Sequence, residues 1–238
     1  PVHLGAKMLY DGGEAHGELG EPGLTERVGA DCRAALEMLT SSLKTYKSSE
    51  VAVVPQAWAP EAEVSVFLEL IQGPPTLLMA GAGHIAQPLA EIGKLMGFRV
   101  VVVDDRPEFA NEERFPGADE VIAEDFSKAL GGYPINEFTY IVLITRGHRH
   151  DEVCLREVLS SPAAYIGMIG SKRRVATVLE DMLKEGFSKY LVDRVHAPIG
   201  IDIGAETPAE IALSIMSEVV NVRRGGPAPS MKVRRART

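Results

Sequence analysis

The chain has 238 residues, of which 45% are hydrophobic, and this is enough for one large or two modest domains with their own cores. Its net charge of -8 argues against a general nucleic-acid binder, because neutralising phosphates requires a basic surface. No apolar run approaches the roughly eighteen residues of a membrane span, and Cys32 and Cys154 suggest no disulfide framework, so we expect a protein of the reducing cytoplasm.

Residues 1–72 predict a small N-terminal α+β domain, which we expect to be truncated because the chain opens at Pro1 as if inside a structure. Residues 6–16 predict a β-hairpin, since Asp11-Gly12-Gly13 supplies the positive-φ positions of a tight turn. Residues 64–70 predict a strand. Between them, five apolar residues follow the spacing of a helix: Val28, Cys32, Leu36, Leu39 and Leu43.

A stiff linker, Gln72-Gly73-Pro74-Pro75, separates this domain from a second one over residues 73–224. Here unbroken apolar runs alternate with helical patterns, as in a parallel sheet that is covered on both faces. Strands are expected at 76–80, 98–103, 120–123, 139–145 and 164–169, and helices at 84–97, 151–160, 171–185 and 208–222. The fold class is therefore α/β, a Rossmann-like doubly wound parallel sheet with a smaller N-terminal α+β domain.

The start of the last helix is clearly marked in the sequence, whereas the segment after this helix has the composition of a disordered tail. Thr207, Pro208 and Glu210 form a capping box with proline at the first helical position. Residues 225–238 are basic and are expected to be disordered, with a weak electrostatic contact to a partner as the alternative.

The most informative segment is the Gly-x-Gly turn that follows the strand at 76–80. Gly81 allows a tight turn, Gly83 lets backbone approach a phosphate, and Ala86 lets the helix lie close to the sheet. The next strand ends in Asp104-Asp105, where nucleotide-binding folds place an acid. The helix N-terminus offers unpaired N–H groups to an anion.

Ligands of parallel sheets bind beyond the carboxyl ends of the strands, so the loops that follow the strands predict the site. These loops should converge on one edge. The candidate binding residues are Gly81, Gly83, His84, Asp104, Asp105, Arg106, Thr145, Arg146, His148, Gly170, Ser171, Lys172 and Arg173.

The loop at 170–174 predicts a second anion site. Ser171 is a good N-cap, but Lys172, Arg173 and Arg174 place three cations in a first helical turn, where they oppose the helix dipole. Backbone amides and basic side chains that point the same way bind anions. The alternative is that these side chains extend into solvent.

Three further assignments have alternatives. Asp104 or Asp105 is expected to bind ribose hydroxyls and Arg106 a second phosphate, unless these are only turn residues. His148-Arg149-His150-Asp151 has ligand types for a metal, but its arginines repel cations, so we expect Asp151 to cap the next helix. Cys154 is expected to be a buried, inert thiol, and no catalytic residue is assigned.

In these motifs the chain resembles the xanthine dehydrogenase accessory factors, the XdhC/CoxI family. The likeness runs through 5–8, 66–69, 81–86, 104–106, 145–151, 167–173, 196–205 and 207–212. His84 after Gly83 and the Gly-Ser-Lys-Arg turn at 170–173 distinguish this group from ordinary dehydrogenases. One departure is 17–23, which stands where many relatives carry a consecutive glycine run before a Glu.

The resemblance implies a chaperone that binds the molybdenum cofactor (molybdopterin or its cytidine dinucleotide), protects it and inserts it into an apo molybdenum hydroxylase of the xanthine or CO dehydrogenase type. It also implies a homodimer and contact with a sulfurase. Gly81–Gly83 would hold one phosphate and Gly170–Arg173 another; residues 104–106 would contact sugar or pterin, and Thr145, Arg146 and His148 would line the edge. The alternatives are an NAD(P)-dependent oxidoreductase, with His148 or His84 as its acid or base, and a nucleotide-sensing regulatory module.

Overall fold

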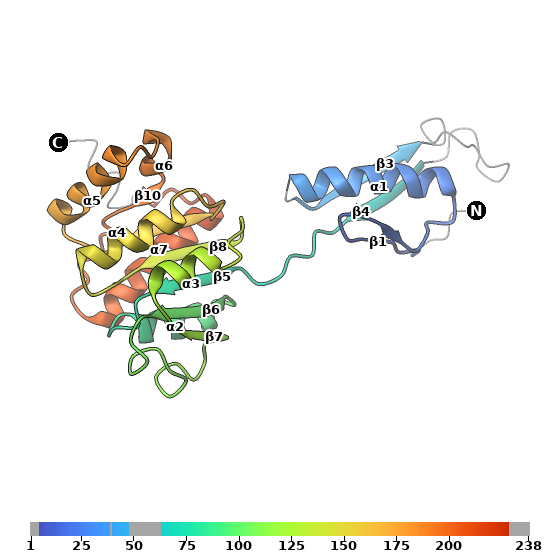
Figure 1. Ribbon diagram of the computed structural model, residues 1–238. Coiled ribbons are helices and arrows are strands. Elements are labelled where there is room, and N and C mark those ends of the chain that lie inside the picture. The colour runs from blue at the N-terminus through green and yellow to red at the C-terminus, as the bar shows by residue number, and fades with distance from the viewer. Residues whose placement is uncertain (1–4, 39, 48–62, 229–238) are drawn as a thin grey trace. The chain divides into compact units, whose positions relative to one another are not determined.

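Unbroken apolar runs between residues 76 and 196 form the parallel sheet of the larger of two units in a computed structural model (Figure 1). The structure describes residues 5–38, 40–47 and 63–228. Contacts divide the chain into Pro1–Gly73 and Pro74–Thr238. No helix in these described ranges is both long and apolar enough to cross a membrane.

The sheet has the strand order of a doubly wound dinucleotide-binding fold. Its parallel strands lie in the order β10-β9-β8-β5-β6-β7. The chain moves outward from β5 to β7 and then returns to β8, so the order reverses between β5 and β8. The strands are β5 Thr76–Ala80, β6 Arg99–Asp104, β7 Glu120–Ala123, β8 Thr139–Leu143, β9 Tyr165–Met168 and β10 Val195–His196.

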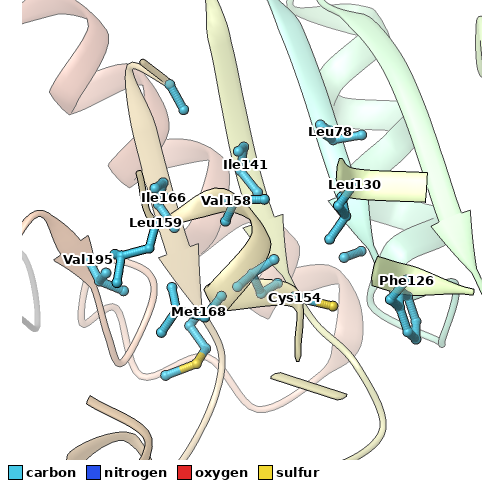
Figure 2. Packing of buried hydrophobic residues seen from close by; sticks show 14 of the residues in the cluster. Leu78, Phe126, Leu130, Ile141, Cys154, Val158, Leu159, Ile166, Met168 and Val195 are labelled. Carbon is cyan, nitrogen blue, oxygen red and sulfur yellow. The ribbon is translucent and has the colours of Figure 1, made fainter. Parts of the chain in front are cut away.

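Helices cover both faces of this sheet. On one face lie α3 Phe126–Gly132, α4 His148–Val158, α5 Lys172–Lys184 and α6 Lys189–Asp193. On the other lie α2 Ala86–Leu95 and α7 Pro208–Arg224. Adjacent strand residues alternate between the two cores: Leu78 belongs to the core that α3 to α6 cover (Figure 2), whereas Leu77 belongs to the core that α2 and α7 cover. The predicted fold class and its five expected strands are confirmed.

The helices agree with most of the predictions. Ser171 caps α5, and Thr207 with Glu210 forms the capping box of α7. One prediction is wrong: α4 begins at His148 with Gly147 as its N-cap, so Asp151 lies inside the first turn and does not cap the helix. The sequence does not indicate β10, α3 or α6, because elements of two, seven and five residues show little periodicity.

The smaller unit is an α+β arrangement. The predicted hairpin is present as β1 Leu9–Tyr10 paired with β2 Ala15–His16. Helix α1 spans Pro22–Glu37, and strands β3 Ser42–Lys47 and β4 Glu63–Leu68 pair antiparallel. Asp31 of α1 ties the helix to this pair of strands, because its carboxylate accepts hydrogen bonds from Lys44 and Tyr46 of β3 at 2.7 and 2.8 Å.

The expected helix from Val28 to Leu43 is therefore wrong at its end. Leu43 lies in β3 opposite Phe67 of β4, because six paired residues of the two strands outweigh a helical spacing that continued by coincidence. Leu39 lies outside the described residues. So do residues 229–238 of the basic tail, which follows the end of α7 at the left-handed Gly225.

A buried carboxylate ties α7 to the edge of the sheet. Glu218 of α7 is fully buried and accepts hydrogen bonds from the Tyr165 hydroxyl and the Gly200 N–H, both at 2.8 Å. His196 Nδ1 lies 3.4 Å from its other oxygen. Burial raises the pKa of Glu218, but these three partners outweigh burial and hold that pKa below its ordinary value of 4.5.

We predict that Glu218→Gln lowers the free energy of unfolding by about 1–3 kcal/mol, because it removes the charge that these buried donors surround. Urea unfolding at about pH 7 measures the difference. Ser217→Ala, an adjacent change on α7 at a half-buried serine whose hydroxyl donates only to the Leu213 carbonyl of its own helix, is the control and should have a smaller effect.

The same pair of proteins should differ in acid. A carboxyl whose pKa is lowered on folding stabilises the fold above its unfolded pKa, and this stabilisation is lost as the pH falls through the folded pKa. The wild type should therefore lose more stability than Glu218→Gln below about pH 4.5. Equal losses would contradict an ionised Glu218.

Candidate functional site

Four of the loops that were predicted to form the site lie at the same edge of the larger sheet. They follow β5, β6, β8 and β9, which are adjacent parallel strands. The carboxyl ends of these strands include the point where the strand order reverses, which is where such sheets bind ligands. We call this the ligand edge.

The first predicted anion site is the Gly81–Ala86 turn between β5 and α2. Gly81 has a φ of 112° and lies against the end of β8, where an added Cβ would be 2.7 Å from the carbonyl carbon of Ile144. An added Cβ at Gly83 would meet no atom within 4 Å. The fold therefore requires glycine at position 81, whereas the space at Gly83 is open to a ligand.

The start of α2 is free of side-chain capping. Its N-cap residue is Ile85, which cannot accept a hydrogen bond, whereas α3, α5 and α7 are capped by Asp125, Ser171 and Thr207. His84 is exposed in the same turn, and Ala86 is fully buried as the helix packs on the sheet. Backbone amides at this helix start can thus bind an anion.

Asp104, at the end of β6, holds this turn in place. Its carboxylate accepts from the Ala82 N–H at 2.8 Å, from the Arg106 N–H at 3.1 Å, and from the Arg106 guanidinium at 2.8 and 3.0 Å. The side chain is about 2% exposed. Burial raises its pKa, but the bonds from Arg106 and Ala82 outweigh burial and lower it. Four bonds fill the four acceptor positions of the carboxylate.

Arg114 was missed by the sequence analysis. Its Nη2 donates to the Ala82 carbonyl at 3.2 Å, and its Nε is buried without a hydrogen-bond partner. Both Arg114 and Arg106 lie over the ring of Phe109, at 5.0 and 3.7 Å from its centroid. Thirty-two residues separate Arg114 from Ala82, so no local pattern could have indicated this contact.

Asp105 and Arg146 form an ion pair across the ligand edge. Arg146 Nη2 lies 2.9 Å from Asp105 Oδ2, and Arg106 Nε lies 3.9 Å from Asp105 Oδ1. Asp105 Oδ1 itself is buried and has no hydrogen-bond partner. The Arg146 side chain is 43% exposed, so its outer part can meet a ligand.

Thr145, Asp151 and Arg174 connect the loop after β8 to the loop after β9. Asp151 is fully buried, with one oxygen bonded to the Thr145 hydroxyl and the other to the Arg174 guanidinium. Burial raises the pKa of Asp151 above its ordinary value, although Thr145 and Arg174 act in the opposite direction. One of the three cations at the start of α5 therefore neutralises a buried acid.

The second predicted anion site is Gly170–Arg173 at the start of α5. A hollow of about 300 Å³ lies beside it, lined by Glu152, Ser171, Arg173, Arg174, Thr177 and Val178. Ser171 Oγ already accepts from the Arg174 N–H at 3.3 Å, and Glu152 adds an acid to the lining. Arg174 Nε is buried without a hydrogen-bond partner. Lys172 and Arg173 supply the remaining basic side chains of this turn.

The structure shows less about the remaining residues that the sequence singled out. His148 is the first residue of α4, and the structure describes only its backbone. In the described part of the chain, no three His, Cys, Asp or Glu side chains gather in a way that could hold a metal ion. Cys154 is fully buried, and burial raises the pKa of its thiol far above the ordinary value, which confirms the prediction of a buried thiol.

Sequence comparisons match the larger unit. A family model described as the XdhC Rossmann domain matches residues 77–219. The uncharacterized protein YqeB of Escherichia coli K12 is 32% identical over 169 residues, which are 71% of this chain and 31% of that protein. A probable xanthine dehydrogenase subunit of Bacillus subtilis 168 is 31% identical over 160 residues, which are 67% of this chain and 46% of that protein. The chain thus spans less than half the length of these two relatives.

A solved structure has a similar fold. The crystal structure of a xanthine dehydrogenase from Bacillus halodurans has a TM-score of 0.57 to this chain and is 20% identical to it. The match covers 95% of this chain and 88% of that one. At this identity, the likeness concerns the fold alone.

We predict that Gly81 and Gly83, in the turn after β5, differ in their contribution to the free energy of unfolding. Gly81→Ala should lower the free energy of unfolding by about 2 kcal/mol or more, because a side chain there is strained at positive φ and overlaps Ile144. Gly83→Ala should change it by less than about 0.5 kcal/mol. Urea unfolding measures both, and equal destabilisation would contradict the open space at Gly83.

Proposed function

Because the chain belongs to the XdhC Rossmann domain family, as its sequence motifs indicated, we propose that it binds the molybdenum cofactor and delivers it to an apo molybdenum hydroxylase. The hydroxylase would be of the xanthine or CO dehydrogenase type, and the chain would protect the cofactor before insertion. The observation on which this rests is the position of two loops at one ligand edge: the open turn at Gly83, and the start of α5 beside a hollow lined by Arg173 and Arg174.

The residues of the ligand edge suit an elongated anionic ligand. Molybdopterin ends in a phosphate, and its cytidine dinucleotide adds a second one. The open turn at Gly83 and the uncapped start of α2 would hold one phosphate. The hollow beside Ser171 and Arg173 would hold another anionic group. When bound in a hydroxylase, the cofactor supplies the metal centre of that enzyme.

The charges of the site favour binding over catalysis. Asp104 is paired with Arg106, Asp105 with Arg146, and the buried Asp151 with Arg174. A general acid or base must reach the reacting atoms, whereas the acid of each pair is already bonded within the protein. We therefore assign no catalytic role to these three acids and propose a maturation chaperone.

The proposed partners are the proteins that delivery of the molybdenum cofactor would require. The main partner is the apo hydroxylase, in accordance with the name of the Bacillus subtilis relative, which describes part of a xanthine dehydrogenase. A sulfurase, which would install the sulfido ligand of the metal, is a second partner. A homodimer would shield the bound cofactor. These partners are part of the proposal.

A nicotinamide dinucleotide is the alternative ligand, because the strand order is that of dinucleotide-binding folds. In those folds an acid at the end of the second strand binds the ribose hydroxyls. Asp104 occupies this position, but its carboxylate already accepts four hydrogen bonds and is buried. Asp104 is therefore not available to bind a ribose, and Asp105, which is paired with Arg146, is the remaining acid at this strand end.

The function is tested by titrating the purified protein separately with molybdopterin and with NADH. We expect submicromolar binding of molybdopterin and much weaker binding of NADH. Mass spectrometry of the small molecules that copurify from a host making molybdopterin should detect the same ligand. Submicromolar binding of NADH without binding of molybdopterin would overturn the proposal.

We predict that the double change of Lys172→Ala and Arg173→Ala weakens molybdopterin binding at least about tenfold, since a charge-assisted hydrogen bond contributes roughly 1.5–3 kcal/mol. Calorimetry measures the affinity. Lys189→Ala, which removes an exposed lysine of α6, is the matched control and should leave the affinity unchanged. Unchanged affinity in the double variant would remove the second anion site from the proposal.

A further inference from the structure

The Asp105–Arg146 ion pair lies across the end of β5. Asp105 follows β6 and Arg146 follows β8, and β5 lies between these two strands in the sheet. The two side chains meet at 2.9 Å, so the pair bridges the strand whose end forms the turn at Gly81. It therefore joins the two sides of the point where the strand order reverses.

We propose that the Asp105 carboxylate occupies on Arg146 the place of an anionic group of the ligand, and that a phosphate or pyrophosphate group must displace it to bind. This inference rests on the proposed function only in that both require an anionic ligand at the ligand edge. It gives Asp105 the role of a competitor, in place of the ligand contact that its sequence position suggested.

Three features support an exchange of partners at Arg146. The Arg146 side chain is 43% exposed and donates to Asp105 through Nη2, so an incoming anion can approach the guanidinium before Asp105 leaves it. Gly83 leaves open space at the turn that the ion pair spans. A phosphate carries more charge than a carboxylate and can bind a guanidinium through two parallel bonds.

The displaced carboxylate has another cation beside it. Asp105 Oδ1 is buried without a hydrogen-bond partner, and Arg106 Nε lies 3.9 Å away from it. A small rotation of the Asp105 side chain toward Arg106 would release Arg146 without leaving Asp105 remote from positive charge. The exchange thus selects for ligands with phosphate groups, because a weaker anion would not displace the carboxylate.

The test uses inorganic pyrophosphate as the probe and calorimetry at low salt, where charge effects are largest. Asp105→Asn should tighten pyrophosphate binding about three- to tenfold, since the internal competitor is gone. Arg146→Gln should weaken binding about tenfold or more. The double variant should behave as Arg146→Gln does, because Asp105 acts only through Arg146.

Asp193→Asn is the control for net charge, since it removes one carboxylate from an exposed ion pair of α6 and should not alter pyrophosphate binding. Weaker binding by Asp105→Asn would show that Asp105 contacts the ligand and would overturn the inference. So would additive effects in the double variant, equal tightening by Asp193→Asn, or a lack of pyrophosphate binding by the wild type and every variant.

These outcomes are separate from the fate of the proposed function. If molybdopterin fails to bind while Asp105→Asn still tightens pyrophosphate binding, the proposed function falls and the exchange at Arg146 stands. If molybdopterin binds and Asp105→Asn does not tighten pyrophosphate binding, only the exchange falls.

Discussion

The ligand edge depends on the four hydrogen bonds of one buried carboxylate, that of Asp104. A single acid at the end of β6 fixes the Ala82 N–H of the neighbouring turn and orients the Arg106 guanidinium that stacks on Phe109. Without it, the Ala82 amide and a largely buried guanidinium would lose their acceptor together, which costs more than either loss in an exposed site. The turn at Gly81 is therefore positioned before any ligand arrives.

From Asp104 a series of contacts between charged groups extends along the edge. Asp104 links the loops after β5 and β6, the Asp105–Arg146 pair links those after β6 and β8, and the Asp151–Arg174 pair links those after β8 and β9. Asp104 is paired with Arg106 of its own loop, whereas Asp105 is paired with Arg146 and Asp151 with Arg174. Two of these acids are buried and fixed, whereas the Asp105–Arg146 pair is partly exposed and can exchange partners.

The sequence was sufficient to place the loops but insufficient to pair their side chains. The apolar strands and the Gly-x-Gly turn predict a parallel sheet, and a parallel sheet brings its loops to one edge. Asp104 and Asp105 are adjacent in sequence, yet Asp104 is buried and accepts from Ala82 and Arg106, whereas Asp105 is partly exposed and pairs with Arg146. The bond between Asp151 and Arg174 joins residues 23 positions apart, and no local period encodes it.

The packing of α7 has a consequence for synthesis of the chain. Ile215 and Val219 of this helix belong to the same core as Leu77 and Val142 of the central strands β5 and β8. A ribosome makes α7 after every strand of the sheet, so the part of this face that α2 does not cover stays exposed until residues 208–224 have been made. A nascent chain that stalls earlier presents an aggregation-prone surface, and the docking of α7 is what covers it.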